Sequence, residues 1–192
     1  MFDEISSIQP KAYSEISEAT KISGFSMASD VKTCSLLRTL AACKPAGKFL
    51  ELGTGTGLSA SWILDGMDSD STLISIDNNP VFSNIAKQFL GSEKRLKLIL
   101  ADAGKWLEEQ SGLRFDFIFA DTWFGKYLNL DKVLSMLNKG GLYIVDDMLP
   151  QDNWPEGHQD KVSKLIKDLD AREDLVLTRQ AWATGIIIAI KK

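Results

Sequence analysis

The sequence predicts an α/β protein with a mostly parallel sheet, helices on both faces, and an antiparallel pair of strands at the C-terminal end. Short apolar runs typical of strands alternate with segments of helical periodicity from about residue 48 onward. A glycine-rich turn over residues 53–57 directly follows the first of these runs. No helical segment separates the last two runs, so we expect those two strands to pair antiparallel.

We expect one domain over residues 1–192, with an N-terminal helical region over 1–46 and an α/β core over 47–192. No linker rich in Pro, Gly or Ser, no low-complexity tract and no internal repeat divides the chain. The 192 residues, 44% of them hydrophobic, are enough to bury a core.

Each expected element has a local signal. In the N-terminal region, Ser29 or Asp30 is a suitable cap for a helix over about 31–40. Pro80 is typical of a helix start. Strands are expected at 48–52, 72–76, 96–100, 115–120, 142–145, 175–179 and 185–190. Further helices are expected at 58–64, from Pro80, directly after Asp102, over 127–137 with its end at 138–141, and around 162–169.

Composition excludes several classes of protein. A net charge of −4 and a pI near 5.1 argue against a nucleic-acid surface, which needs a basic patch. No apolar run approaches the roughly 20 residues that span a membrane. The stretch Met1–Ile5 lacks the basic and apolar regions of a signal peptide. Cys34 and Cys43 form no metal-binding pattern, so we expect reduced thiols and a cytoplasmic protein.

The glycine-rich turn predicts a site for an adenosine-containing cofactor. Glycines let the backbone turn with positive φ and approach a ligand closely. Asp77 ends the next strand, 20 residues past Gly57, where a carboxylate can accept hydrogen bonds from both ribose hydroxyls. The third glycine comes one residue too early for a dinucleotide fingerprint. Glu51, two residues before the first glycine, favours a positively charged cofactor without phosphate.

These residues resemble the first motif of class I S-adenosylmethionine-dependent methyltransferases, E-x-G-x-G-x-G, followed by a strand ending in an acid. The resemblance covers nearly the whole chain from about Met27 and implies a Rossmann-like, seven-stranded methyltransferase sheet that binds S-adenosyl-L-methionine. Asp102 fits the adenine side of such a site, although an aspartate there is also a common helix N-cap. The implied cofactor-binding residues are Met27, Glu51, Gly53, Thr54, Gly55, Gly57, Asp77, Asn78, Asp102, Ala103 and Asp121.

Three carboxylates follow two strands that we expect to be neighbours. Asp121 comes after the strand at 115–120, and Asp146 and Asp147 come after the strand at 142–145. Such carboxylates would repel one another and raise each other's pKa, which makes a bound cation their natural partner. Oxygen ligands favour Mg²⁺ or Ca²⁺ over zinc.

This arrangement resembles the metal-dependent O-methyltransferases of the catechol and caffeoyl-CoA type. In that group an F-x-D motif is followed by a tyrosine, and the next strand ends in Asp-Asn; here Phe119-Ala120-Asp121 precedes Tyr127, and Asp146-Asp147 ends the strand. The resemblance implies a metal site at Asp121, Asp146 and Asp147 for Mg²⁺ or another divalent cation. It also implies a small acceptor and a homodimer, since such enzymes are frequently dimers.

The family's catalytic lysine, three residues after the strand-end aspartate, is replaced here by Phe124. Lys126 is a candidate substitute that would take or stabilise the acceptor proton, and otherwise it faces solvent. His158 is a weaker alternative for this role. We therefore expect Asp121 and Lys126 to be the catalytic residues.

Aromatic residues gather near these positions and indicate a planar acceptor, unless they fill the core or a dimer interface, as Trp182 could. They are Trp123, Phe124, Tyr127, Trp154 and Trp182. The sequence thus predicts transfer of a methyl group from S-adenosylmethionine to a hydroxyl of a small aromatic acceptor. The alternatives are a metal-independent enzyme with another acceptor, a cofactor-binding protein without activity, and an NAD-dependent oxidoreductase.

Overall fold

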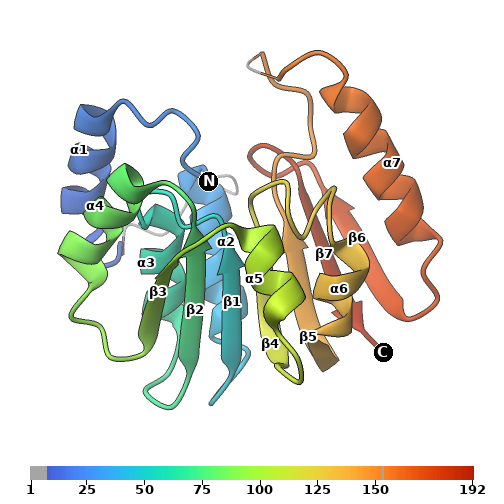
Figure 1. The fold of residues 1–192 in the computed structure, drawn as a ribbon, viewed down its shortest axis with the longest axis horizontal. Coiled ribbons are helices and arrows are strands. Elements are labelled where there is room, and N and C mark those ends of the chain that lie inside the picture. Colours follow the sequence, from blue (N-terminus) through green and yellow to red (C-terminus); the bar gives the residue numbers. More distant parts are fainter. Residues whose placement is uncertain (1–7, 153) are drawn as a thin grey trace.

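The computed structural model describes residues 8–152 and 154–192, which contain a seven-stranded sheet in the order β3-β2-β1-β4-β5-β7-β6 (Figure 1). The signal-peptide prediction, which depends on residues 1–5, lies outside the described residues. The strands are β1 Lys48–Leu52, β2 Thr72–Asp77, β3 Leu96–Leu100, β4 Phe115–Ala120, β5 Leu137–Val145, β6 Leu175–Gln180 and β7 Ile186–Lys191.

The pairing of the strands confirms the predicted fold class. Strands β1 to β5 pair in parallel, whereas β7 pairs antiparallel with both β5 and β6. The chain leaves β1 toward β2 and β3 on one side and later returns to place β4 on the other side of β1. Ligands bind at such a reversal point, outside the carboxyl ends of the strands.

Helices cover both faces of the sheet (Figure 1). The first four pack in one hydrophobic core and the last three in the other. They are α1 Tyr13–Ser23, α2 Val31–Ala41, α3 Leu58–Gly66, α4 Pro80–Leu90, α5 Ala103–Glu109, α6 Leu130–Ser135 and α7 His158–Asp170. None of the helices in the described part of the chain is long and apolar enough to cross a membrane.

Alternation along the strands divides the core between the two faces. In β4, Phe117 and Phe119 pack with α1–α4, whereas Ile118 and Ala120 pack with α5–α7. All four side chains are fully buried. A strand buried on both faces reads as a continuous apolar run, which is why the sequence predicts the bounds of β4 correctly.

Helix starts agree with the capping signals. Asp30 accepts a hydrogen bond from the backbone N–H of Lys32 at the start of α2. Asn79 accepts from the N–H groups of Val81 and Phe82 at the start of α4, where Pro80 is the first helical residue. Each such cap stabilises a helix by about 1 kcal/mol.

The prediction of a helix over 127–137 that ends at 138–141 is wrong. The helix α6 covers only Leu130–Ser135, and β5 already begins at Leu137. The N–H of Phe115 donates to the carbonyl of Met136 at 2.8 Å, and Phe115 pairs with Leu137, so strand pairing with β4 claims this segment. The glycines expected to end the helix instead lie inside β5, where Gly140 has a φ of 75°.

Candidate functional site

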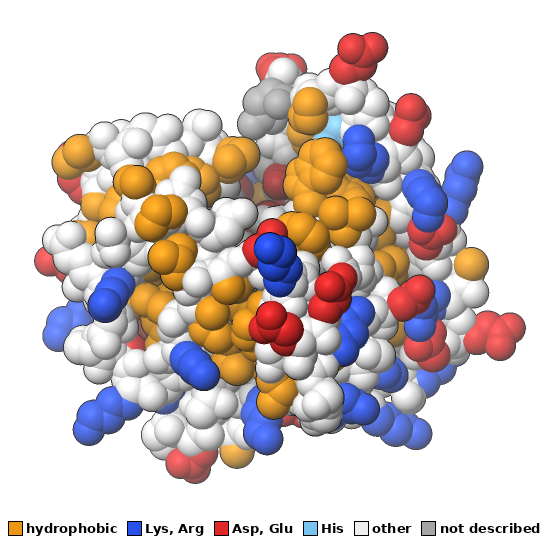
Figure 2. Space-filling model, in the orientation of Figure 1, with side chains coloured by type: hydrophobic (Ala, Val, Ile, Leu, Met, Phe, Trp, Pro, Cys, Tyr) orange, Lys and Arg blue, Asp and Glu red, His pale blue; other side chains and the backbone are white. Residues whose placement is uncertain are grey.

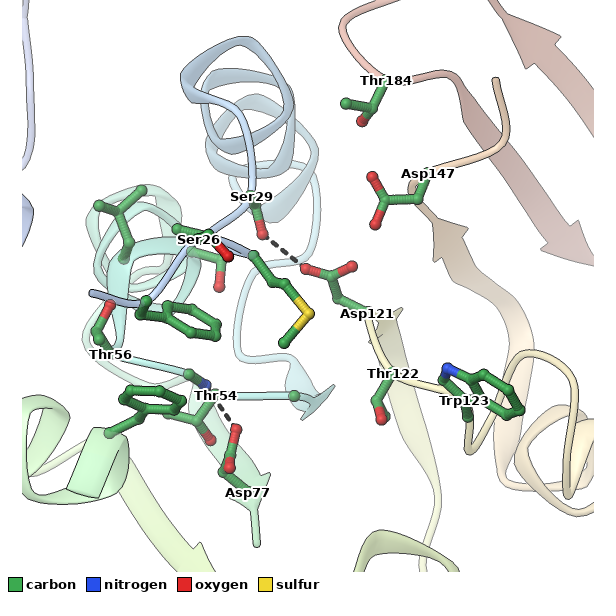
Figure 3. Close-up of a pocket in the computed structure, with 18 of the residues that line it drawn as sticks. Ser26, Ser29, Thr54, Thr56, Asp77, Asp121, Thr122, Trp123, Asp147 and Thr184 are labelled. Carbon is green, nitrogen blue, oxygen red and sulfur yellow. Dashed lines mark hydrogen bonds between the residues drawn. The ribbon is translucent and has the colours of Figure 1, made fainter. Parts of the chain in front are cut away.

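A cavity of about 530 Å³ lies at the carboxyl ends of the central strands. Its walls come from the segment before α2, the loops after β1, β2, β4 and β5, the start of α7, and Thr184 between the last two strands. Figure 3 shows labelled residues from several of these segments facing one space. The cavity therefore occupies the place where parallel α/β sheets bind their ligands.

The glycine-rich turn forms the floor of this cavity, and two of its positions require glycine. Gly53 has a φ of 102°, and a Cβ built there would lie 2.7 Å from the backbone oxygen of Asp121. Gly55 has a φ of 51°, and a Cβ there would lie 2.8 Å from the ring of Phe25. The turn therefore passes close to both β4 and the N-terminal segment. A side chain at either of these two positions would prevent this close approach.

Asp77, at the end of β2, is held in place by backbone donors. Its Oδ2 accepts from the N–H of Gly55 at 2.7 Å (Figure 3), and its Oδ1 accepts from the N–H of Asn79 at 2.8 Å. Each carboxylate oxygen can accept more than one hydrogen bond. The side chain is thus fixed against the glycine turn and still has acceptor capacity toward the cavity that it lines.

Glu51 lies beneath the turn and does not line the cavity. It is fully buried and accepts hydrogen bonds from Ser59, at 2.6 Å, and from Ser75. Burial raises the pKa of Glu51 to about 8, although the two serine hydrogen bonds oppose this shift. At neutral pH the group is mostly protonated, so it supports the turn from below as a neutral acid.

A second, smaller cavity of about 50 Å³ shares Gly53, Asp77 and Asn78 with the main one. Ala103 and Phe124 line it as well. Asp102 lines neither cavity: it caps α5 by accepting from the N–H of Lys105 at 2.8 Å. The helix cap that the sequence offered for Asp102 is thus present, and its place on the adenine side of a cofactor stays a prediction.

The predicted cofactor residues divide into those that line a cavity and those that support one. Met27, Gly53, Thr54, Gly55, Asp77, Asn78, Ala103 and Asp121 line a cavity. Glu51, Gly57 and Asp102 do not. Gly57 begins α3 with a φ of 90° and faces Ala86 and Leu90 of α4, so its role is close packing.

Asp121 extends from the end of β4 into the main cavity. Ser29 donates a hydrogen bond of 2.8 Å to its Oδ2 (Figure 3). Burial raises the pKa of Asp121 to about 7; the charge of Lys126 opposes this shift, and the charges of Asp146 and Asp147 add to it. Because β4 and β5 are neighbouring strands, the three predicted carboxylates form one electrostatic cluster.

The donor set of these carboxylates does not fit a divalent cation. Asp146 accepts from Thr184 at 2.6 Å and from the N–H of Asp147, and Asp147 accepts from Gln151 at 2.7 Å. Asp146 does not line the cavity, whereas Asp121 and Asp147 do. Within the described ranges, no three His, Cys, Asp or Glu side chains form a group that could hold a metal ion.

Lys126 does not face solvent. It is 4% exposed, lines the main cavity, and holds its Nζ 5.6 Å from the ring centroid of Tyr127. Phe124, at the position where the resemblance implies a lysine, packs instead on Gly104 of α5, where an added Cβ would lie 2.4 Å from its ring. The loop after β4 therefore directs Phe124 away from the main cavity and Lys126 into it.

Aromatic side chains form the wall next to Lys126. Trp123, Tyr127, Trp154 and His158 line the cavity, and the hydroxyl of Tyr127 lies 3.1 Å from Nε2 of His158. Burial lowers the pKa of His158, and the charge of Lys126 adds to this effect. Figure 2 shows hydrophobic side chains gathered beside this single histidine. Trp182 is not part of the wall, because its Nε1 donates to the carbonyl of Lys32.

Several residues of the site carry no sequence signal. Ser29, Gln151 and Thr184 each hydrogen-bond one of the three carboxylates, yet a serine, a glutamine and a threonine in loops are unremarkable. Ser29 is 92 positions from Asp121. Only the completed fold could have identified them.

The strand order and the cavity define a Rossmann-like methyltransferase fold, and comparison with known proteins agrees. The model of the O-methyltransferase family matches residues 3–184. The chain therefore belongs to the O-methyltransferase family.

Individual relatives are more distant. Catechol O-methyltransferase B of Danio rerio is 30% identical over 130 residues, which are 62% of this chain and 49% of that protein. A protein of Mycobacterium sp. (strain JLS) is 36% identical over 91 residues, 45% of this chain and 41% of the relative. The matches thus span about half or less of these curated relatives. A solved O-methyltransferase from Bacillus cereus in complex with SAH has a TM-score of 0.82 at 17% identity, covering 97% of this chain and 93% of its own.

Proposed function

We propose that this protein transfers a methyl group from S-adenosylmethionine to a hydroxyl oxygen of a small aromatic acceptor. The family supports the reaction type, and the B. cereus structure is of a protein in complex with SAH. The observation that carries the proposal is Asp77, fixed by two backbone N–H groups at the end of β2 beside the glycine turn.

The charge of the cavity supports a cationic cofactor. Among the described residues that line it are four aspartates, Asp30, Asp77, Asp121 and Asp147, against one lysine. Such a lining favours a sulfonium and an ammonium group and disfavours the phosphates of a dinucleotide. The same balance argues against the NAD-dependent alternative.

The two cavities would take separate parts of the cofactor. Asp77 would accept the ribose hydroxyls, while Asn78, Ala103 and Phe124, which line the smaller cavity, would border the adenine ring. The methyl group would then point toward the acidic part of the main cavity, between the glycine turn and Asp121. Met27, 70% exposed at the rim, would cover the cofactor from outside.

The aromatic wall supports a planar acceptor. Trp123, Tyr127 and Trp154 offer ring faces and edges, and Lys126 offers a positive charge on the same side of the cavity. S-adenosylmethionine supplies an activated methyl group on a positively charged sulfur when it is bound. The protein then contributes by holding the acceptor oxygen in line with that methyl, by excluding water, and by stabilising negative charge on the oxygen through Lys126.

No step of this proposal uses a divalent cation, because the carboxylates do not form a suitable donor set. The predicted Mg²⁺ or other divalent ion has no role in this proposal, and the homodimer and the cytoplasmic location stay predictions. A cofactor-binding protein without activity is the competing proposal, because Phe124 replaces the family's catalytic lysine. Transfer to any hydroxylated acceptor would distinguish the two.

Isothermal titration calorimetry with S-adenosylhomocysteine tests the cofactor site. We expect one site per chain in the wild type and a loss of affinity of at least about 30-fold in Asp77→Ala, from the loss of hydrogen bonds to a charged acceptor. Asp70→Ala is the matched control, because Asp70 is exposed and does not line the cavity. Equal affinity in Asp77→Ala, or preferential binding of NADH, would contradict the proposal.

A further inference from the structure

Lys126 brings a positive charge into the acidic part of the main cavity. It is the only lysine or arginine among the described residues that line the main cavity, and it shares that lining with Asp121 and Asp147. At 4% exposure its side chain is among the few buried charged groups of the described chain. Phe124 packs on Gly104 instead of entering this space.

A buried ammonium group requires compensation by negative charge. Taking it out of water costs several kcal/mol unless carboxylates or hydrogen bonds offset the loss. Asp121 and Asp147 line the same cavity as Lys126 and supply this negative charge. The ammonium of Lys126 and the acidic cluster thus stabilise one another.

The same arrangement disfavours a divalent cation. An added Mg²⁺ would share the cavity with the positive charge of Lys126, and like charges in a partly desolvated site repel strongly. Of the three carboxylates only Asp121 and Asp147 line the cavity, whereas Asp146 uses its Oδ1 to bind Thr184 and the N–H of Asp147. Each of these carboxylates already has a protein partner.

We propose that the ammonium of Lys126 replaces the divalent cation of related enzymes, and that the acceptor is an aromatic compound that needs only one ionised hydroxyl, so that a vicinal diol is not required. This inference rests on the proposed methyltransferase function. A divalent cation with open coordination positions can hold two neighbouring oxygens. An ammonium is a compact point charge that suits one phenolate oxygen.

Methyl transfer to a phenolate needs no general base in the site. The phenolate oxygen forms the new O–CH₃ bond with its own electron pair, the CH₃–S bond breaks, and its electrons go to sulfur, leaving neutral S-adenosylhomocysteine. The proton of the phenol has already been lost to water before binding. Lys126 keeps the oxygen ionised and oriented while Trp123, Tyr127 and Trp154 contact the ring.

Two measurements on chelator-treated protein test the inference. The first is calorimetric titration of Mg²⁺ and of Mn²⁺ into protein saturated with S-adenosylhomocysteine. We expect no binding tighter than about 1 mM in the wild type, and binding at least about tenfold tighter in Lys126→Met, whose carboxylates have lost their counter-charge. Lys164→Met is the matched control, because Lys164 is exposed on α7 and should behave as wild type.

The second measurement is methyl transfer from S-adenosylmethionine to 4-nitrophenol and to 4-nitrocatechol, which differ by one hydroxyl, with and without chelator. We expect transfer to both at rates within about threefold and unaffected by chelator, and a loss on the order of 100-fold in Lys126→Met without weaker S-adenosylhomocysteine binding. The Lys164→Met control should retain wild-type rates.

The outcomes separate the inference from the proposed function. Chelator-sensitive transfer restored by Mg²⁺, or transfer to 4-nitrocatechol alone, would overturn the inference and leave the methyltransferase function standing. Binding of S-adenosylhomocysteine without transfer to either phenol would overturn the acceptor class. Failure to bind S-adenosylhomocysteine at all would overturn the proposed function. Because the wild-type measurements do not depend on any variant, a folding defect in Lys126→Met would not rescue the inference.

Discussion

Ser29 donates a hydrogen bond of 2.8 Å from its hydroxyl to Oδ2 of Asp121, joining the segment before α2 to the end of β4. This contact links the N-terminal helical region to the central strand of the site. It also lowers the pKa of the buried Asp121 carboxyl, which burial alone would raise further. The orientation of Asp121 therefore depends on a residue outside the α/β core.

Ser29→Ala should lower the free energy of unfolding by about 1 kcal/mol, because a partly buried carboxyl loses a hydrogen-bond donor. Urea unfolding followed by circular dichroism measures this change. Ser92→Ala is the control, since Ser92 is exposed in the loop before β3 and should leave stability unchanged. Equal stability of the Ser29 and Ser92 variants would show that the contact contributes nothing.

Glu51 predicts a specific pH dependence of stability. Burial raises its pKa from 4.5 to about 8 in the folded state, so the folded protein binds a proton that the unfolded chain releases. Its contribution to stability is therefore complete below pH 4.5 and is lost as pH rises toward 8. Relative to Glu51→Gln, the wild type should lose up to ~1.4 kcal/mol per pH unit over this window.

Unfolding in urea at several pH values across this window measures the difference. Glu93→Gln is a matched control, because Arg95 lowers the pKa of Glu93 to about 2, so that residue stays ionised throughout. The Glu93 variant should keep the slope of the wild type. A wild-type slope equal to that of Glu51→Gln would mean that Glu51 is ionised in the folded protein.

Gly53→Ala should destabilise the protein by more than about 2 kcal/mol, because alanine is strained at positive φ and its Cβ would clash with backbone. The position has a φ of 102°, and the Cβ would lie 2.7 Å from the Asp121 backbone oxygen. Gly112→Ala separates the two effects, since Gly112 has a φ of 76° but open space around its Cβ. A loss of stability no greater than that of Gly112→Ala would show that the close approach between the Cβ and the backbone contributes nothing.

Tyr127→Phe should weaken acceptor binding while leaving the affinity for S-adenosylhomocysteine unchanged. The variant keeps the aromatic wall but loses the hydroxyl that lies 3.1 Å from Nε2 of His158, so His158 can shift within the cavity. We expect KM for the phenol to rise about five- to tenfold, corresponding to ~1 kcal/mol or slightly more. An unchanged KM would place the acceptor away from this pair.

Most of the fold could be predicted because its strands are short, apolar and bounded by clear turn signals. The bounds of β1, β3 and β4 agree with the sequence prediction. The segment 127–137 could not be predicted, because its residues pattern as a helix until β4 recruits Leu137 into the sheet. Long-range strand pairing overrode the local preference there.

The sequence predicted the residues of the candidate site that follow strands, but it did not predict most of those in loops. Asp77, Asp121 and Asp147 line the main cavity, as expected from their places after parallel strands. The loop after β4 has no such regularity, so the sequence could not decide whether Lys126 faces solvent or the cavity. The partners of the carboxylates, Ser29 and Thr184, come from distant segments and need the folded chain to be identified.

The most direct test of the account is a single-turnover reaction with S-adenosylmethionine carrying an isotope-labelled methyl group, 4-nitrophenol as acceptor, and chelator present throughout. Mass spectrometry and NMR would follow the label. The account predicts that in the wild type the label appears on the phenol oxygen as a methyl ether, as fast with chelator as without it. It also predicts that Lys126→Met slows this transfer. Label that remains on S-adenosylmethionine in chelator and moves only when Mg²⁺ is added would contradict it.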